Sequence, residues 1–341
     1  MIQLKRGINL GGFLSQCVHT VAHYDSFISE TDIKKIKEYG FDHVRLPIDY
    51  MVFETEEGER KEEGFKRVHD IIGWCKNNDM PIILDLHKAY GYDFNDADND
   101  SKNNLFSDAG AQDRFLKLWE RIAKEYSKYD FVAFELLNEV VEDKNASAWN
   151  SLISRAVEVI RNITKDTPII YGGIKYNSAD TIELLDPPHD ENIIFTFHFY
   201  EPLVFTHQWA YWMPQMKEIG AVNYPDSMEV YREKSKILGL QGNTVLSSSL
   251  KEMNIDYLRE MVKKAVTDAA KVNAPLYVGE FGVIDQAPPA DTLRWFEDTM
   301  QVFRENNIGC ALWSYKDMDF GINEEHYAPI QKDMIKVLTE I

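Results

Sequence analysis

The feature that most constrains the fold of this 341-residue chain is an alternation of short apolar runs with longer amphipathic stretches from one end to the other. The short runs have the composition of buried strands, and the longer stretches repeat their apolar residues at helical spacing, as parallel βα units do. Eight strand-like runs lie near residues 7–10, 43–46, 81–86, 131–137, 168–172, 193–199, 275–279 and 309–313. The predicted helices between them include residues 31–39, 65–77, 112–126, 149–163, 255–271 and 290–306. Eight alternations favour an α/β fold closed into a (β/α)8 TIM barrel over an open sheet.

One connection is much longer than an ordinary βα loop. It runs from residue 201 to residue 254, after the sixth strand-like run, and its first half is rich in large aromatic side chains. A loop of this length in a compact domain usually has a function or structure of its own. Because no linker divides the chain, we expect a single catalytic domain over residues 1–341, with residues 201–254 as an inserted lid or subdomain within it.

Charge and composition exclude several classes of protein. The net charge of −19 repels phosphate backbones and argues against a nucleic acid partner. No apolar run is long enough to cross a membrane, and the first residues lack a secretory h-region, so we expect a cytoplasmic protein unless a leader was removed. The three cysteines, Cys17, Cys75 and Cys310, lie far apart without zinc spacing, and we expect buried free thiols.

Two glutamates stand at the carboxyl ends of strand-like runs about half a chain apart. Glu139 follows the fourth run and Glu280 follows the seventh. In (β/α)8 barrels this face carries the catalytic residues, and the two strands lie across the barrel mouth from one another. Cleavage of a glycosidic bond needs a proton for the leaving oxygen and a nucleophile or an activated water, which two carboxyl groups supply; a separation of about 5 Å would mean retention of configuration.

Further polar and aromatic residues belong to the same face, where we expect each at or just past the last turn of its strand: Arg45, His87, Asn138, His198, Tyr200 and Trp313. Arg45 and the hydroxyl of Tyr200, if they lie beside Glu280, would favour its charged form. A less compensated site would raise the pKa of Glu139. Each residue has a structural explanation when taken singly, and only the combination is specific.

The remaining roles are those of sugar contacts. Asn138 has an amide that can donate to a sugar hydroxyl, and the two histidines can fix hydroxyls or orient the carboxylates. Trp313 would form the floor of the sugar site, because flat rings complement the apolar faces of pyranoses. In the long connection, Trp209 and Trp212 are candidates for further stacking platforms; the alternative is that its aromatic side chains pack onto the barrel rim.

Short motifs carry the main candidates: Val44-Arg45-Leu46-Pro47, Leu84-Asp85-Leu86-His87, Asn138-Glu139, Phe197-His198-Phe199-Tyr200, Gly279-Glu280-Phe281-Gly282 and Trp313. Over essentially the whole chain these motifs resemble glycoside hydrolase family 5. The opening Arg6-Gly7-Ile8-Asn9-Leu10-Gly11-Gly12 is similar to that family's first strand, and the long connection resembles the small inserted subdomain of its clostridial endoglucanases. The resemblance implies a retaining β-glycanase in which Glu139 is the acid/base and Glu280 the nucleophile.

Two departures from the family bear on the substrate. Many endoglucanases of the family have a second histidine where this chain has Lys88, and relatives often have tryptophan where it has Phe13. We expect hydrolysis of internal β-1,4 bonds in cellulose-type or mixed-linkage β-1,3-1,4-glucans by a monomer without a cofactor. The alternatives are a β-mannanase, an exo-acting β-glucosidase and, from another class, a non-catalytic carbohydrate-binding barrel.

The acidic stretch 93–100 has alternating oxygen ligands like those of a calcium loop. An EF-hand counted from Asp96 would need glycine where Ser101 stands and glutamate where Ser107 stands. The histidines lie on separate strands without the spacing of metallohydrolases. We therefore predict no metal site.

Overall fold

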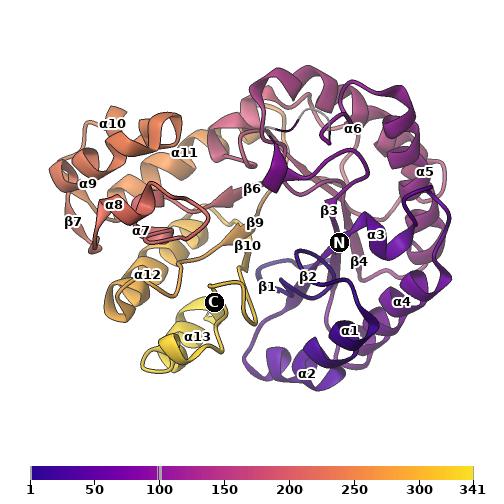
Figure 1. Ribbon diagram of the computed structural model, residues 1–341, viewed down its shortest axis with the longest axis horizontal. Coiled ribbons are helices and arrows are strands. Elements are labelled where there is room, and N and C mark those ends of the chain that lie inside the picture. Colours follow the sequence, from indigo (N-terminus) through magenta and orange to yellow (C-terminus); the bar gives the residue numbers. More distant parts are fainter. Residues whose placement is uncertain (1, 98, 100–101, 341) are drawn as a thin grey trace.

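The eight strands predicted from the sequence form one closed parallel barrel. The computed structural model describes residues 2–97, 99 and 102–340. The strands pair in the order β1-β10-β9-β6-β5-β4-β3-β2, and Figure 1 shows the ring of helices around them. Their bounds are β1 (Arg6–Asn9), β2 (His43–Asp49), β3 (Ile82–Lys88), β4 (Val132–Glu135), β5 (Ile169–Gly172), β6 (Ile193–Phe199), β9 (Leu276–Phe281) and β10 (Gly309–Leu312). The TIM-barrel prediction is confirmed, and each predicted run overlaps one strand, with ends that differ by up to three residues.

Each of the predicted amphipathic stretches coincides with a helix to within a few residues, and the structure has further helices that were not predicted. Their bounds are α1 (Val21–Phe27), α2 (Glu30–Glu38), α3 (Tyr50–Phe53), α4 (Glu62–Asn77), α5 (Ala109–Tyr126), α6 (Ala146–Arg161), α7 (Leu203–Thr206), α8 (Met216–Ile219), α9 (Met228–Ser235), α10 (Asn243–Ser247), α11 (Ile255–Lys271), α12 (Pro289–Glu305) and α13 (Gln331–Thr339). Local chemistry sets several starts. Ser29 and Asp32 form a capping box at α2, and the Asp108 side chain accepts from the amide of Ala111 at α5. Between β5 and β6 the connection is the 3₁₀ helix η3 (Ala179–Leu184).

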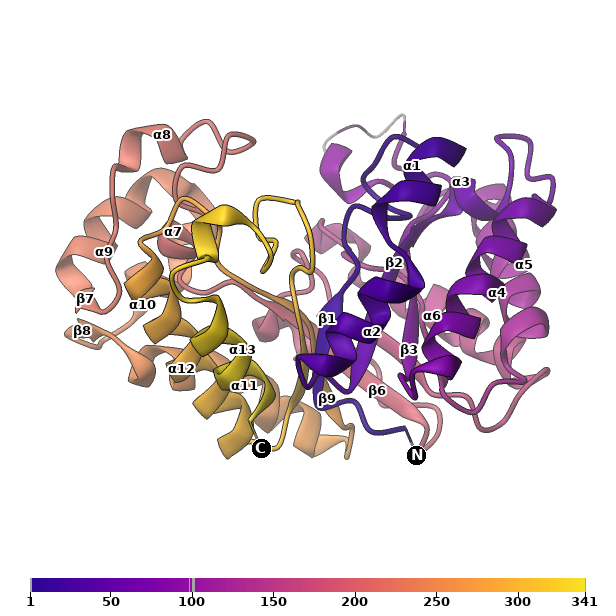
Figure 2. The ribbon, with the colours of Figure 1, turned by 90° about the horizontal axis from the view of Figure 1, so that it is seen from below.

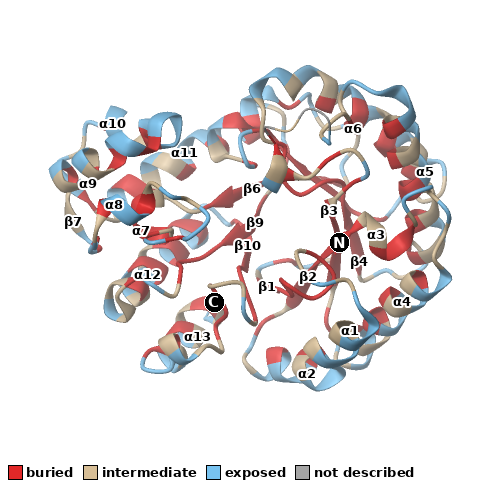
Figure 3. Ribbon diagram, in the orientation of Figure 1, coloured by how far each residue is buried: buried red, intermediate tan, exposed pale blue. Residues whose placement is uncertain are grey.

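The barrel interior has an apolar layer below a polar one. Leu4, Ile83, Ala133, Ile170, Tyr277 and Ala311 form a buried apolar cluster inside the barrel. Since side chains alternate along a strand, Asp85 and His87 share the inner face with Ile83. The same spacing places Glu135 above Ala133. Figure 3 shows that the strands are buried along their length, so the polar layer is desolvated and sits towards the carboxyl ends of the strands.

The segment between β6 and α11 contains structure of its own. Besides α7 to α10 it includes the 3₁₀ helix η4 (Lys236–Gly242) and an antiparallel pair, β7 (Asp226–Ser227) with β8 (Glu252–Met253). Figures 1 and 2 show these elements grouped on one side of the barrel, next to α11 and α12. Phe205 and Tyr224 are fully buried with ring centroids 5.6 Å apart. Part of the aromatic content therefore packs within the segment, and the Tyr224 hydroxyl ties the segment to the barrel by donating to Asp298 of α12 at 2.8 Å. The role of the segment as a lid stays a prediction.

The burial of the cysteines agrees with the expectation for two of the three. Cys75 and Cys310 are buried free thiols, but Cys17 is only half-buried, because it lies in the loop after β1 at the open face of the barrel. Phe13 is fully buried and packs against Phe27. No helix in the described part of the chain combines the length and hydropathy that a membrane span requires.

Candidate active site

Arg45 is the centre of the polar layer. It lies in the middle of β2, not at the end of its strand as expected, and its long side chain reaches up through the barrel. The fully buried guanidinium donates from Nε and Nη2 to the two oxygens of Glu135 at 2.8 and 2.9 Å, and from Nη1 to Glu280 Oε1 at 2.8 Å. Further bonds reach Asn9 and Asn138 at 2.9 and 2.8 Å. With its donors all used, Arg45 cannot rotate away from Glu280 without losing several buried hydrogen bonds.

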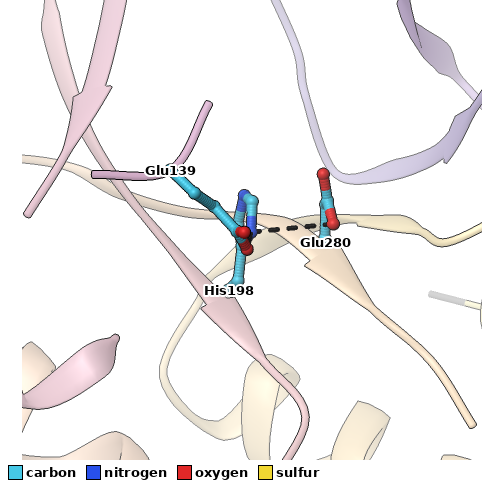
Figure 4. A group of neighbouring side chains, drawn as sticks. All are labelled: Glu139, His198 and Glu280. Atoms are coloured by element: carbon cyan, nitrogen blue, oxygen red, sulfur yellow. Dashed lines mark hydrogen bonds and ion pairs between the residues drawn. The ribbon is translucent and has the colours of Figure 1, made fainter. Parts of the chain in front are cut away.

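Glu139 and Glu280 face one another across His198, as Figure 4 shows. One atom from each of these three side chains lies within 4.8 Å of the others. His198 Nδ1 is 2.7 Å from Glu139 Oε1 and 3.6 Å from Glu280 Oε2. A register shift between β6 and β9 brings His198 opposite Glu280. A Cβ atom at Gly279 would lie 3.1 Å from His198 Nε2, so this glycine lets the imidazole pack closely.

The two carboxyl groups are equally buried but differently surrounded. Burial and the nearby Glu280 charge raise the pKa of Glu139 well above its usual value. Burial also raises the pKa of Glu280, but the contact with Arg45 and a hydrogen bond from the Tyr200 hydroxyl at 3.0 Å oppose this. Glu280 is therefore the carboxyl group better able to hold a charge, and Glu139 the better proton carrier.

His198 and His87 both stay neutral in this environment. Burial lowers the pKa of His198 well below its usual value and that of His87 to about 4. His87 Nδ1 lies 2.6 Å from Asp85 Oδ2, and its Nε2 lies 3.1 Å from the amide nitrogen of Gln16. Since an amide nitrogen can only donate, His87 carries its proton on Nδ1 and accepts at Nε2.

Asp85, Glu135 and Asn9 belong to the site but were missed as candidates. Asp85 and Glu135 are fully buried and share Arg45, and burial raises the pKa of each to about 7. The Asn9 amide donates to the carbonyl of Gly279, next to Glu280, at 2.9 Å. A signal was present in the sequence, because an acid in the middle of a buried parallel strand needs a partner.

The other predicted residues divide into two groups. Trp313 lies just past β10, 6% exposed, with its ring nearly parallel to that of His87 at 5.8 Å. Trp212 connects to the site through His207, whose ring lies 6.0 Å from Trp212 and 4.9 Å from Tyr200. Trp209 is 41% exposed and, among the described residues, has no ring contact with this group. The structure thus brings together all the predicted residues except Trp209.

A cavity of about 580 Å³ continues the site over the loops that follow β1, β2 and β3. Gln16 lines it and contacts His87. Lys88, at the position of the expected second histidine, also lines the cavity and donates to Asp93 at 2.8 Å. Lys102 pairs with Asp96 at 2.6 Å. Two lysines therefore neutralise part of the acidic stretch 93–100, of which Asp98 and Asp100, like Ser101, lie outside the described residues.

The Glu139, His198 and Glu280 ligand atoms are close enough to surround one cation. The donor set does not suit one, because Glu280 Oε1 already faces the positive guanidinium of Arg45 at 2.8 Å and Oε2 accepts from Tyr200. These contacts explain the cluster without an ion, and the absence of a metal stays a prediction.

Comparison with known proteins places this geometry in a family. Residues 6–319 match the family described as Cellulase (glycosyl hydrolase family 5). The chain is 39% identical to Endoglucanase C of Acetivibrio thermocellus, covering 99% of this chain and 98% of that protein. It is 36% identical to Cellodextrinase A of Ruminococcus flavefaciens, covering 89% and 83%. A crystal structure of Thermotoga maritima Cel5A with a mannotriose substrate is similar with a TM-score of 0.75 and 25% identity, covering 98% and 97%.

The chain belongs to glycosyl hydrolase family 5. It is a glycoside hydrolase of the cellulase type, built on the (β/α)8 barrel.

Proposed function

We propose that the protein is a retaining endo-β-1,4-glucanase that hydrolyses internal bonds of cellulose-type or mixed-linkage β-1,3-1,4-glucans. The observation that carries this proposal is the pair of Glu139 and Glu280, with carboxylate oxygens within 4.8 Å of one another and only Glu280 in contact with Arg45. A separation near 5 Å leaves no room for a water between carboxylate and sugar, which favours a covalent intermediate over direct attack by water.

The reaction takes two steps. In the first, Glu280 attacks the anomeric carbon while Glu139 transfers its proton to the departing glycosidic oxygen, so one C–O bond forms as the other breaks. In the second, Glu139 takes a proton from water, and the water oxygen displaces Glu280 from the anomeric carbon. Each step inverts that carbon, so the product keeps the β configuration and both glutamates return to their starting protonation states.

The surrounding residues position the groups that react. Arg45 and Tyr200 hold Glu280 and stabilise its negative charge, while neutral His198 orients Glu139. Arg45 fixes the amide oxygen of Asn138, which turns its NH₂ group away from the guanidinium and makes it a donor for a sugar hydroxyl. His87 accepts at Nε2 beside the sugar, and the indole of Trp313 lies parallel to it as the floor of the subsite.

The inserted segment 201–254 extends the substrate site on one side of the barrel. Trp212 continues the ring contacts of Tyr200 and His207 outwards. Trp209 and Trp212 are 41% and 43% exposed, which suits residues that stack on the sugars of a bound chain. We propose that this segment is a lid or subdomain within one catalytic domain, and that the enzyme acts as a monomer without a cofactor.

The names of the relatives support a β-glucan substrate, since two of them are described as an endoglucanase and a cellodextrinase. A β-mannan is the second candidate, because the structure of the Thermotoga protein was solved with mannotriose. Exo action would require one end of the substrate site to be closed. A non-catalytic binding barrel is disfavoured by the intact pair of glutamates.

Azide rescue tests the roles of the two glutamates on a dinitrophenyl β-cellobioside, whose leaving group needs no proton. Glu280→Ala with azide should give the α-glycosyl azide, because azide takes the place of the missing nucleophile. Glu139→Ala with azide should give the β-glycosyl azide, because azide attacks the covalent intermediate. Glu38→Ala, an exposed glutamate of α2, is the matched control and should hydrolyse like the wild type. Exchanged products would reverse the assignment.

Product analysis tests the substrate. Wild-type enzyme should cut cellohexaose and mixed-linkage glucan internally and release a range of oligosaccharides early in the reaction. Faster cleavage of mannohexaose would favour the mannanase, and release of single sugars from one end would favour exo action. Binding of all three substrates without any turnover would leave only the non-catalytic barrel.

A further inference from the structure

A buried threonine at the start of the inserted segment contacts both sides of the nucleophile site. Thr206, the last residue of α7, is fully buried where the segment leaves the barrel. Its carbonyl accepts from the amide of Ile284 at 2.9 Å, in the loop after β9, and its hydroxyl donates to the carbonyl of Tyr200 at 2.5 Å, just past β6. Glu280, at the end of β9, accepts in turn from the hydroxyl of Tyr200. Thr206 therefore connects the end of β6 to the loop that follows Glu280.

The partners of Thr206 fix the directions of its hydrogen bonds. A carbonyl can only accept, so the Thr206 hydroxyl gives its proton to Tyr200, and its oxygen accepts from His207 Nδ1 at 3.1 Å. The loss of water around the ring lowers the pKa of His207 to about 3, so the ring is neutral and carries its proton on Nδ1. The hydroxyl of Thr206 thus acts as donor and acceptor at once, which an apolar side chain of the same shape cannot do.

The ring of Tyr200 is held separately from its backbone. The ring of His207 lies 4.9 Å from it at 80°, and the ring of Phe320 lies 5.9 Å from it at 65°. These edge contacts limit the rotation of the Tyr200 ring, while the Thr206 hydroxyl limits the movement of its backbone. Burial and the charge of Glu280 raise the pKa of Tyr200 well above its usual value, so its hydroxyl keeps the proton that it donates to Glu280.

The charge of Glu280 depends on a small number of contacts. Its Oε1 faces Arg45 at 2.8 Å, and its Oε2 accepts from Tyr200 at 3.0 Å. The other titratable groups that act on it are Asp85 and His87 of β3, Glu139 after β4 and His198 of β6. Because a donated hydrogen bond favours the charged carboxylate, displacement of Tyr200 would raise the pKa of Glu280 and leave less of its ionised form at acidic pH.

We propose that Thr206 is a positioning residue for the reaction, whose hydroxyl fixes the backbone of Tyr200 and so keeps the Tyr200 hydroxyl within hydrogen-bond distance of Glu280. The inference deepens the proposed function and rests on it for the role of Glu280. Thr206 acts through Tyr200, and the inserted segment takes part in catalysis without having to close over the substrate.

The test is the pH profile of kcat/KM for Thr206→Val, with dinitrophenyl β-cellobioside as the substrate. Since this leaving group needs no proton, kcat/KM reports the attack of Glu280 on the sugar. At the pH optimum kcat/KM should fall roughly three- to tenfold, as expected for the loss of one buried hydrogen bond. The acidic limb of the profile should move to higher pH. Thr206→Ser keeps the hydroxyl and should resemble the wild type in both respects.

A double-mutant cycle separates positioning from packing. Tyr200→Phe removes the hydroxyl that donates to Glu280, so Thr206→Val in that background should cause no further loss and no further shift of the acidic limb. Thr206→Ala removes the same hydroxyl without placing a methyl group against the Tyr200 carbonyl, and it should show the shift if the valine variant does not fold. Thr292→Val is the matched control and should keep the wild-type profile. Thr292 of α12 is equally buried, and its hydroxyl has no hydrogen-bond partner among the described residues.

Three results would overturn the positioning role. These are an unchanged acidic limb in both Thr206→Val and Thr206→Ala, an equal loss from Thr206→Val with and without the Tyr200 hydroxyl, and a loss in Thr206→Ser as large as in Thr206→Val. Wild-type enzyme that releases no dinitrophenol from the cellobioside would instead overturn the proposed function. The two failures are therefore distinguishable.

Discussion

Two polar networks in this barrel hold carboxyl groups by different means, one fully buried around Arg45 and one partly buried around Glu201. The Arg45 network, at the centre of the barrel, contains one guanidinium and three carboxyl groups in contact with it, Asp85, Glu135 and Glu280. The Glu201 network, where the inserted segment meets the barrel, contains no cation in contact with its carboxyl group within the described residues. Of the residues that the structure describes, only Thr244 and Tyr257 donate to Glu201, through their hydroxyls at 3.1 and 3.0 Å.

Burial raises the pKa of Glu201 to about 7, as it does for Asp85 and Glu135. The two networks differ in how far a positive charge opposes this effect of burial. In the Arg45 network several acids share one guanidinium, whereas no cation contacts the Glu201 carboxyl group among the described residues. A network built around a cation depends on that cation, because removal leaves buried acids uncompensated. A network of hydroxyls can tolerate a neutral carboxyl group, and its strength should depend on pH instead.

The largest expected effect is that of Arg45→Met. Loss of the cation leaves buried carboxyl groups without a partner, so the free energy of unfolding should fall by about 3–5 kcal/mol and hydrolysis should be lost. Denaturant unfolding measures this. Arg259→Met is the control, because Arg259 forms exposed pairs with Asp256 and Glu305 and should leave stability unchanged within error. Equal losses in the two variants would contradict the comparison.

The second largest effect is expected for Glu201→Gln, which should make the free energy of unfolding less dependent on pH than in the wild type. The folded-state pKa of Glu201 is about 7 and the ordinary value is 4.5, so folding keeps the proton on. The protonated Glu201 side chain makes its full contribution to the free energy of unfolding below pH 4.5. That contribution is lost as the pH rises through about 7, because Glu201 loses its proton at a lower pH in the unfolded chain than in the folded protein. The wild type should lose roughly 3 kcal/mol more than Glu201→Gln between pH 4.5 and pH 8. Urea unfolding at both values checks this, and parallel curves would mean that Glu201 is charged when folded.

A smaller effect is expected for Asp85→Asn. This substitution leaves the Arg45 guanidinium in place and changes the tautomer of His87. The new amide can donate to His87 Nδ1 and would move the ring proton to Nε2, where it opposes the amide nitrogen of Gln16. We expect kcat/KM on cellohexaose to fall at least about tenfold. Asp93→Asn, which loses only the partly exposed pair with Lys88, is the control and should change it less. Similar values would show that the tautomer is unimportant.

The smallest effect is that of Thr244→Val in the Glu201 network. Since Tyr257 still donates to the carboxyl group, the loss of one hydroxyl donor should cost about 0.5–1.5 kcal/mol of unfolding free energy at neutral pH. Thermal or urea unfolding measures the change. Activity on a short substrate should stay near the wild-type value, and a loss as large as that of Arg45→Met would mean that the two networks act as one.

Much of the fold was predictable from local pattern. Barrel strands are nearly continuous in apolar residues, and their register follows from alternation, so their positions could be read from composition. The short pair β7 and β8 was missed, because strands of two residues leave no periodic signal. Arg45 was expected at the end of its strand but lies within it, because the reach of its side chain, not its position on the strand, brings it to the other polar residues.

Residues of the candidate site could be predicted only where a polar or aromatic residue stood at the end of a predicted strand. Asp85 and Glu135 lie inside strands, and nothing in their local sequence says which cation they share. Trp209 and Trp212 have the same local signal, an exposed aromatic residue in a long connection. Only the folded chain connects Trp212 to Tyr200 through His207.

The sequence by itself determined the alternation that closes the barrel and the residue types at its open face, because both depend on periods of two and 3.6 residues. The tertiary structure alone decided how charge is shared there. One guanidinium reaches acids from three different strands, and burial raises the pKa of those that it cannot fully compensate. The strength of such interactions depends on distances of a few ångströms and on the loss of water, and neither is encoded by any one segment of the chain.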